Sequence, residues 1–335
     1  MFLFLVLFIS FEALGAETVG SFFIQSIHLR PTFLSQEDTG ADFSLADSTF
    51  AIGWKKNKNL SVFFEVGSEK LRNLPAYYAA SEQNRLGFYK AFIEFQGVYG
   101  RFRFGLIPLN FGYDGILENY ERIFNKSLLY SQRIIGISDY GMSFFSELNG
   151  YYTQLTIHNG EIDTTSDGRL WVSGNWGYTD GRNFRTQLSL QTGYVRGDVS
   201  TGATNTLAGV VNGEIALWRN GVIFANWYQR NWNVVMQFGG GEVKQDDDTG
   251  RYSTEMYELT NTFTKNLGVG VRYDKLNPNR KASGDGVTEV SLMFLLKSID
   301  STSNFVILGT KAIEESSERH NDQLRIEWVL TPFAR

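Results

Sequence analysis

Apolar and polar residues alternate with a period of two along most of the chain, in segments of about ten residues that end at Gly, Asn or Asp. In residues 100–107, Phe102, Phe104 and Leu106 fall on one face, and Arg101 and Arg103 fall on the other. A helix would scatter these residues around its surface. The same alternation recurs in 154–158, 187–191, 269–274 and 323–328. The pattern therefore predicts β-strands with one apolar and one polar face.

The connections between these segments alternate between short and long. Short connections are expected at 57–59, 97–100, 149–150, 179–183, 219–221, 265–266 and 300–303. Longer polar stretches are expected at 35–45, 69–85, 110–138, 161–168, 197–205, 230–250, 277–286 and 313–321. Seven turns and eight loops join sixteen strands and leave both termini on the turn side. The interval 230–250 leaves open whether Trp232–Phe238 form a further strand.

This rhythm is typical of an all-β, transmembrane, antiparallel up-and-down β-barrel of about 16 strands, with short periplasmic turns and long external loops. After residue 16, the sequence has no apolar stretch near the roughly 20 residues that a membrane-spanning helix needs. Lipid offers no water to unpaired backbone groups, so strands cross it only as a closed barrel. Aromatic residues make up 15% of the chain, and several lie near segment ends, where the interfaces of a membrane barrel concentrate them. These are Tyr140, Tyr151, Trp176, Tyr178, Phe184, Tyr194 and Tyr273.

Two alternatives remain open at this stage. A secreted soluble β-sandwich or β-helix, such as a carbohydrate-binding or adhesion module, would pack its apolar faces together and leave the envelope without detergent. A structural barrel with a blocked lumen would share the fold of a channel and differ only in conductance.

The first sixteen residues differ from the rest of the chain. Phe2–Phe11 form a nearly unbroken apolar run that ends at Leu14-Gly15-Ala16. The run is too short to cross about 30 Å of hydrocarbon as a helix, and it resembles a signal peptide, although no Lys or Arg precedes it. We therefore expect a signal peptide at 1–16 and the barrel at 17–335.

Charge and motif content narrow the function. The 335-residue chain has a formal net charge of −5 and no cysteine, so neither a nucleic-acid partner nor a thiolate metal site is indicated. A catalytic serine triad would have to use His28, His158 or His320, and none of them lies near a nucleophile elbow. Phosphate-binding loops, zinc spacings and EF-hand loops are absent from the sequence. We predict no enzyme activity, no cofactor and no bound metal.

At this point the chain resembles Gram-negative outer-membrane porins, through its leader, its hairpin rhythm and its terminal strand. In 323–335, Leu324, Ile326, Trp328 and Leu330 alternate like the closing strand of such proteins, although Phe333 is out of phase and follows Pro332. The resemblance implies location in the outer membrane, contact with lipid and lipopolysaccharide, and a homotrimer.

A narrower resemblance is to porins of the phosphate-selective O and P type. It rests on Gly105-Leu106-Ile107-Pro108-Leu109-Asn110-Phe111-Gly112, on Asp139-Tyr140-Gly141 and on Tyr152–Gly160. It implies that the stretch after Pro108 is a long loop that folds into the lumen. The dense ladders of cations on which phosphate selectivity rests are not seen in this sequence, so phosphate is not implied as the solute.

The candidate pore residues follow from this topology. A constriction within 110–138 would present Asp114, Glu118, Glu121, Arg122, Lys126 and Arg133. Lumen parity places Arg30, Lys90, Glu94, Arg101, Arg103, Arg185, Arg272 and Arg325 on the pore wall. Because the signs are mixed, we expect a water-filled channel for passive diffusion of small polar solutes or ions with weak selectivity. For each residue, the alternative is a salt-bridged lumen charge that stabilises the wall without tuning transport.

Overall fold

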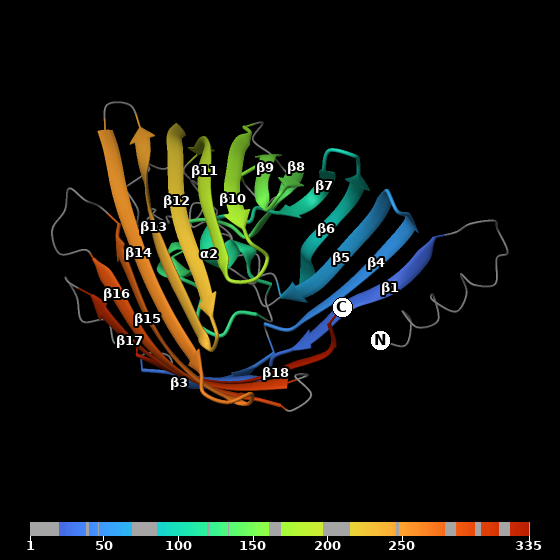
Figure 1. The fold of residues 1–335 in the computed structure, drawn as a ribbon. Helices are drawn as coiled ribbons and strands as arrows, with labels where there is room; N and C mark the ends of the chain where they lie inside the picture. Colours follow the sequence, from blue (N-terminus) through green and yellow to red (C-terminus); the bar gives the residue numbers. More distant parts are fainter. Residues whose placement is uncertain are drawn as a thin grey trace.

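The computed structural model folds into antiparallel strands that surround an interior segment (Figure 1). It describes residues 20–37, 40–45, 47–68, 86–118, 121–132, 134–160, 169–196, 215–245, 248–278, 286–298, 303–314 and 322–334. The signal peptide predicted at 1–16 lies outside these ranges. The strands are β1 (Ser21–Leu29), β2 (Thr32–Gln36), β3 (Gly40–Ser44), β4 (Thr49–Asn57), β5 (Leu60–Ser68), β6 (Leu86–Gln96), β7 (Arg101–Pro108), β8 (Ser138–Leu148), β9 (Tyr151–His158), β10 (Trp171–Thr179), β11 (Phe184–Arg196), β12 (Ile215–Gln229), β13 (Trp232–Gln245), β14 (Asp248–Thr262), β15 (Leu267–Asn277), β16 (Val287–Lys297), β17 (Ser303–Glu314) and β18 (Gln323–Ala334).

The described segments form a closed barrel of sixteen strands, as predicted. β1 and β2 are two parts of one strand, interrupted at Arg30 and Pro31, because both pair with β18. β3 and β4 are likewise two parts of the second strand, which pairs with the first. Pairing of β18 with β1 and β2 closes the sheet. Closure leaves no sheet edge whose backbone N–H and C=O groups would lack hydrogen-bond partners in lipid.

Seven short connections lie at one end of the barrel, as predicted, but one was misplaced. Residues 219–221 are not a turn: they lie inside β12, and the turn falls at 230–231. The interval 230–250 is not a loop either, because β13 and the start of β14 occupy most of it. The predicted strand count holds because Trp232–Phe238 form the first half of β13. Both described ends of the barrel, β1 and β18, lie at the turn end.

The wrong prediction has a physical cause. Gly221 of β12 pairs with Gly240 of β13. Gly240 belongs to the run Gly239–Gly241, which has the composition of a loop in the sequence. A side chain at Gly239 would come within 2.6 Å of Val222. These glycines permit close approach of neighbouring strands and do not mark turns.

The outer surface is apolar and the inner surface is polar. Leu188 and Leu190 are 40% and 44% exposed, whereas their neighbours Gln187 and Ser189 are 2% and 0% exposed. Because the outward residues are apolar and accessible, the barrel is built to be surrounded by lipid. The described residues contain no helix long and apolar enough to cross a membrane.

The alternation in β7 ends earlier than predicted. Phe102 and Phe104 are exposed, but Leu106, expected on the same face, is only 1% exposed. The change occurs at Gly105, whose φ is +130° and whose position leaves no room for a side chain against the Ala91 carbonyl. Leu106, Ile107 and Pro108 are all buried, so this end of β7 directs the chain into the barrel.

Aromatic side chains lie near both ends of the outer surface. Of the seven aromatics singled out from the sequence, Tyr151, Trp176, Phe184 and Tyr194 are exposed. Tyr151 and Tyr178 pair across β9 and β10 with ring centroids 4.9 Å apart. Such positions suit rings that meet lipid headgroups.

Candidate pore and its interior segment

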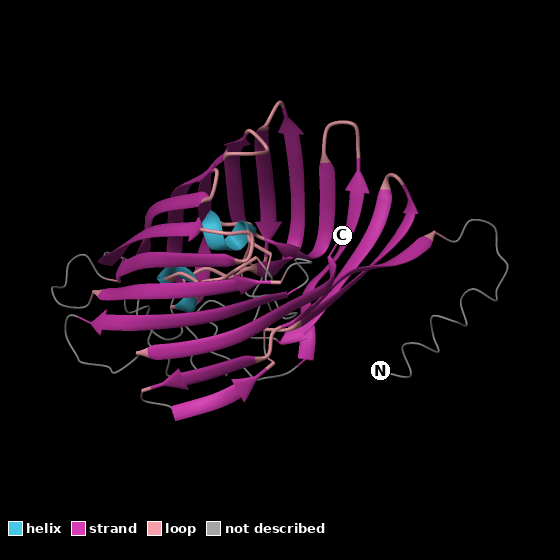
Figure 2. Ribbon diagram, turned by 60° about the horizontal axis from the view of Figure 1, so that its bottom comes forward, coloured by secondary structure: helices cyan, strands magenta, loops and turns pink. Residues whose placement is uncertain are grey.

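Residues 109–137 enter the barrel between β7 and β8. They contain two short helices, α2 (Gly112–Ile116) and α3 (Leu128–Ser131), which lie within the ring of strands (Figures 1 and 2). The backbone N–H of Leu109 donates to the carbonyl of Ile137 at 2.9 Å, which closes the neck of the segment. Pro108 ends β7, as predicted. Gly112 has a φ of +63° and no room for a side chain against Gln237.

Apolar contacts attach this segment to the inner wall. α2 packs on β11 and β12, and α3 packs on β15. The largest cluster joins the segment to inward side chains of β10, β12, β13, β14 and β15, and its members include Leu128, Leu129, Tyr130, Ile135, Trp171, Trp218, Val243, Tyr252 and Leu276. Smaller clusters form around Phe124 and Tyr113. Half of the lumen wall is therefore a packed core and not a wet surface, which the sequence did not predict.

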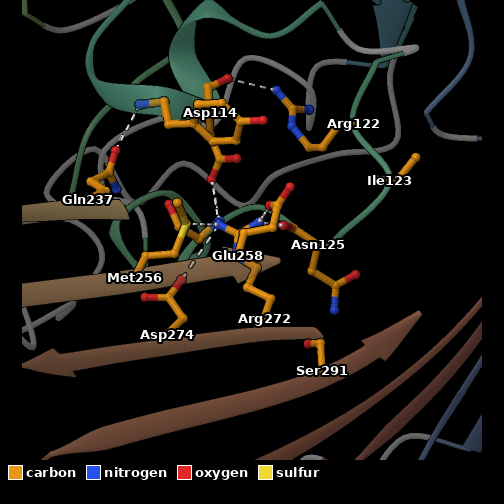
Figure 3. A network of polar contacts seen from close by, with 12 residues as sticks. Asp114, Arg122, Ile123, Asn125, Gln237, Met256, Glu258, Arg272, Asp274 and Ser291 are labelled. Atoms are coloured by element: carbon orange, nitrogen blue, oxygen red, sulfur yellow. Dashed lines mark hydrogen bonds and ion pairs between the residues drawn. The ribbon is translucent and has the colours of Figure 1, made fainter. Parts of the chain in front are cut away.

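A network of buried charges adds to this attachment (Figure 3). Arg272 on β15 lies 3.1 Å from Asp114 in α2, 3.7 Å from Asp274 and 3.8 Å from Glu258. It also donates to the Asn125 carbonyl at 2.8 Å. Burial alone would raise the pKa of Asp114, but Arg272, Arg122 and hydrogen bonds from Ser127 hold that pKa below its ordinary value. Asp114 therefore attaches the segment to β15 through Arg272.

Two further arginines attach the segment to the other side of the barrel. Arg30 lies 2.6 Å from Glu327 and donates to the Arg122 carbonyl at 3.1 Å. Arg325 lies 3.4 Å from Glu327 and donates to Asn125 Oδ1 at 2.6 Å. Arg122 in turn donates to the Asp114 carbonyl at 3.2 Å. Arg30, Arg272 and Arg325 therefore pair with buried carboxylates, and Arg122 donates to a backbone carbonyl of the segment.

Lys90, Glu118 and Glu121 lie where the segment leaves α2. Lys90 Nζ lies 2.6 Å from Glu118 and 3.2 Å from Glu65. Glu121 accepts a hydrogen bond from the Glu118 N–H at 2.9 Å and is exposed. Lys126 lies half-buried in the segment, and Arg133 lies outside the described residues.

The remaining predicted wall residues lie together and contact aromatic rings. The guanidinium of Arg101 lies 4.4 Å from the Phe145 ring centroid, and that of Arg185 lies 5.3 Å from the Tyr152 ring centroid. Arg103 lies 4.8 Å from the Phe92 ring centroid and 2.7 Å from Glu94. Within the described ranges, no carboxylate lies within 4.0 Å of the guanidinium nitrogens of Arg101 or Arg185.

Three cavities lie around the interior segment. One of about 370 Å³ and one of about 250 Å³ share Lys90, Arg101, Arg103, Pro108 and Glu118 in their linings. A third, of about 680 Å³, is lined by Glu121, Arg230, Thr260 and Lys297 towards the turn end. Leu117 lines both the second and the third. Two of the three cavities therefore lie beside the segment on the side of Arg101 and Arg103.

The structure also brings together a serine, a histidine and an aspartate that the sequence did not connect. His158 Nδ1 lies 2.6 Å from Asp139 Oδ2, and His158 Nε2 lies 2.8 Å from Ser173 Oγ. Each of the three residues is only 1% exposed, and none lines the three cavities. Asp139 also accepts from the N–H groups of Tyr140 and Gly160. The arrangement resembles a hydrolytic triad in its hydrogen bonds, but its hydroxyl has no access to solute, so it fixes the wall beside the root of the segment.

Comparison with known proteins identifies the fold. No protein-family model matches the chain, and no curated protein matches it by sequence. Among solved structures, OmpT, an outer membrane protein of Vibrio cholerae in trimer form, is 10% identical with a TM-score of 0.69 and covers 93% of this chain and 99% of its own. The outer membrane channel DcaP of Acinetobacter baumannii is 6% identical with a TM-score of 0.67, over 94% and 98%. An anion-selective porin from Comamonas acidovorans is 12% identical with a TM-score of 0.63, over 93% and 99%. The chain therefore has the fold of outer-membrane porin barrels.

Proposed function

We propose that this protein is a porin of the outer membrane, a passive diffusion channel in which residues 109–137 form the constriction. The observation that supports it is the position of that segment. It is packed against one half of the inner wall and leaves cavities with charged linings on the other half. Rings of charge at such a passage set the ion preference of a channel. We propose transport as the role; the Ser173 hydroxyl, which meets His158, is enclosed in the wall.

Reconstitution into planar bilayers tests this function. Purified protein should produce discrete current steps in potassium chloride, with conductance that increases with salt concentration. Correctly folded protein that produces no steps would contradict the proposal and favour a structural barrel with a blocked lumen.

We further propose a weak preference for anions. Arg101 and Arg185 line the 250 Å³ cavity, lie against aromatic rings and have no carboxylate of the described residues within 4.0 Å. This refines the expectation of mixed signs, because Arg30, Arg122, Arg272 and Arg325 are occupied by contacts within the protein.

Removing both arginines is expected to shift the reversal potential towards cation preference. In an Arg101→Gln and Arg185→Gln variant, Glu94 and Glu118 remain at the passage, and their charge acts over about 10 Å at 0.1 M salt. The measurement is the zero-current potential across a tenfold potassium chloride gradient. Arg219→Gln is the control, because that side chain points outward and is 59% exposed. Equal potentials in all three proteins would show that these arginines do not set selectivity.

The environment of the barrel is tested by charge placed on each face. Leu190→Arg is expected to impair insertion, because a cation that faces lipid at mid-bilayer costs about 2–4 kcal/mol in barrels. Thr260→Arg faces the 680 Å³ cavity and should fold. Gln191 also faces inward but is tightly packed, so it is a poorer control. The readout is heat-modifiable migration of outer-membrane fractions, and equal loss in both variants would contradict the assignment of faces.

The partners are proposals that follow from the fold. A homotrimer is supported by the trimer form of the Vibrio cholerae protein. Contact with lipopolysaccharide is supported by the outward cluster of Arg219, Glu242 and Arg251, in which the arginines lie 3.0 and 3.7 Å from Glu242. The other proposed partners are lipid around the outer surface and small polar solutes or ions in the lumen.

A further inference from the structure

The passage wall beside the interior segment alternates arginines with aromatic rings. Its members, which we call the aromatic–arginine wall, come from β5, β6, β7, β8, β9 and β11 and are Phe63, Phe92, Arg103, Arg101, Phe145, Tyr152 and Arg185. Phe63 and Phe92 stack with centroids 5.2 Å apart, and Phe145 and Tyr152 stack with centroids 6.2 Å apart. Each stacked pair is contacted by at least one arginine. Aromatic residues therefore face the inside of this barrel, where a porin wall needs only polar side chains.

Two kinds of contact are offered to a solute in the same space. The 370 Å³ cavity is lined by the aromatic rings of Phe23, Phe63 and Phe92 and by charged side chains. Among these charges, Arg103 pairs with Glu94, and Lys90 pairs with Glu65 and Glu118. Arg101 is the cation of this lining that has no carboxylate of the described residues within 4.0 Å. Its volume falls within the range of about 300–1,000 Å³ of small-molecule sites. An arginine fork binds a carboxylate through two parallel hydrogen bonds, and aromatic rings prefer offset or edge contacts with other rings.

We infer that the channel favours aromatic monocarboxylates, of which benzoate is the simplest, over aliphatic carboxylates of smaller size. This inference rests on the proposed function and names its preferred solute class. An inorganic anion would gain nothing from Phe23 and Phe63. A neutral sugar would gain no charge–charge attraction from Arg101 and Arg185, which have no carboxylate of the described residues within 4.0 Å. A benzoate-type ion uses both sets at once.

The side chain of Arg185 is also ordered before a solute binds. Arg185 Nε donates to the Tyr152 hydroxyl at 3.2 Å, which fixes the guanidinium against the wall. A side chain that is already ordered loses less conformational freedom when it binds an anion. The contacts remain weak individually, so a solute can move along the wall and leave the channel.

Permeability ratios in planar bilayers test the inference. Reversal potentials are measured with sodium chloride on one side and sodium benzoate or sodium acetate on the other, at pH 7. A pore filled only with water passes acetate faster than benzoate, because the smaller ion diffuses faster. We expect the wild-type channel to pass benzoate faster than acetate.

Variants separate the aromatic contribution from the charge. Phe23→Ser with Phe63→Ser should lower the benzoate-to-acetate ratio by a factor of about 2 to 10, the range of aromatic pair energies, and leave the chloride-to-sodium ratio unchanged. Phe64→Ser is the matched control, because Phe64 is the next residue on β5 and is exposed on the outer face. Arg101→Gln with Arg185→Gln should lower the permeability of both carboxylates together.

The outcomes distinguish this inference from the function on which it rests. A wild-type channel that conducts sodium chloride but passes acetate faster than benzoate would overturn the inference and leave the porin function intact. The same holds if the double phenylalanine variant matches Phe64→Ser. A folded protein without conductance would overturn the proposed function, and the inference with it.

Discussion

Replacing residues 110–136 with a short Gly-Ser turn is expected to raise the single-channel conductance several-fold and to leave the barrel folded. The neck of the segment is already closed by the hydrogen bond from Leu109 to Ile137 and by the pairing of Pro108 with Ser138, so a hairpin turn can join β7 to β8. The segment is the part of the described chain that fills the lumen. Its removal would expose Trp218 and Tyr252 to water and lower stability, but the strand ladder would remain paired.

The measurement is conductance in planar bilayers, with heat-modifiable migration as the test of folding. A smaller excision, such as 119–131, is a weaker test, because it removes the buried Leu128 and Tyr130 but leaves α2 against the wall. Arg219→Gln changes an exposed side chain on the outer surface without shortening the segment and should conduct like the wild type. A folded excision variant with unchanged conductance would show that residues 109–137 do not limit the pore.

The fold could be predicted from the sequence because lipid imposes one rule on every strand. An outward residue must be apolar, so the alternation of Leu188 and Leu190 with Gln187 and Ser189 identifies the faces directly. The rule fails where glycine lies inside a strand to make room for its neighbours, and not in a turn. Gly239–Gly241 have the composition of a loop but lie in the middle of β13, where neighbouring side chains occupy the space.

The pairing of the lumen charges could not be predicted in the same way. Arg30 and Arg101 both have lumen parity, but Arg30 meets Glu327, which lies 297 positions along the chain, whereas Arg101 meets an aromatic ring. Such contacts depend on the path of the interior segment, which no local pattern encodes. For the same reason Asp139, His158 and Ser173 were not connected, because they lie on three different strands.

Parity nevertheless contained a signal for the aromatic–arginine wall. Phe92 has the parity of Glu94, and Tyr152 has that of Gln154, so the rule that located the arginines would also place both rings on the inner face, an assignment that the sequence analysis did not make. A water-filled pore needs only polar side chains on its wall. Aromatic residues at inward positions therefore indicate packing or contact with a solute. Distances to Arg101, Arg103 and Arg185 came only from the structure.

Arg272→Met is expected to lower the free energy of unfolding by about 3–5 kcal/mol, because removal of one partner from a buried ion pair leaves uncompensated charge. Arg272 is the cation shared by Asp114, Glu258 and Asp274, all of which are buried. Without it, the three carboxylates repel one another, and α2 loses its ion pair to β15. The segment should then move within the lumen, which adds noise to the open-channel current.

Urea unfolding in lipid vesicles, followed by tryptophan fluorescence, measures the first effect, and current recordings measure the second. Arg219→Met is the matched control, because its pair with Glu242 lies on the outer surface with the arginine 59% exposed, and exposed pairs contribute only about 0–1 kcal/mol. Adding Asp114→Asn to Arg272→Met removes one of the repelling carboxylates and should recover part of the lost stability. If Arg272→Met is as stable and as quiet as Arg219→Met, the buried network does not hold the segment, and the apolar contacts of Leu128, Leu129 and Tyr130 hold it alone.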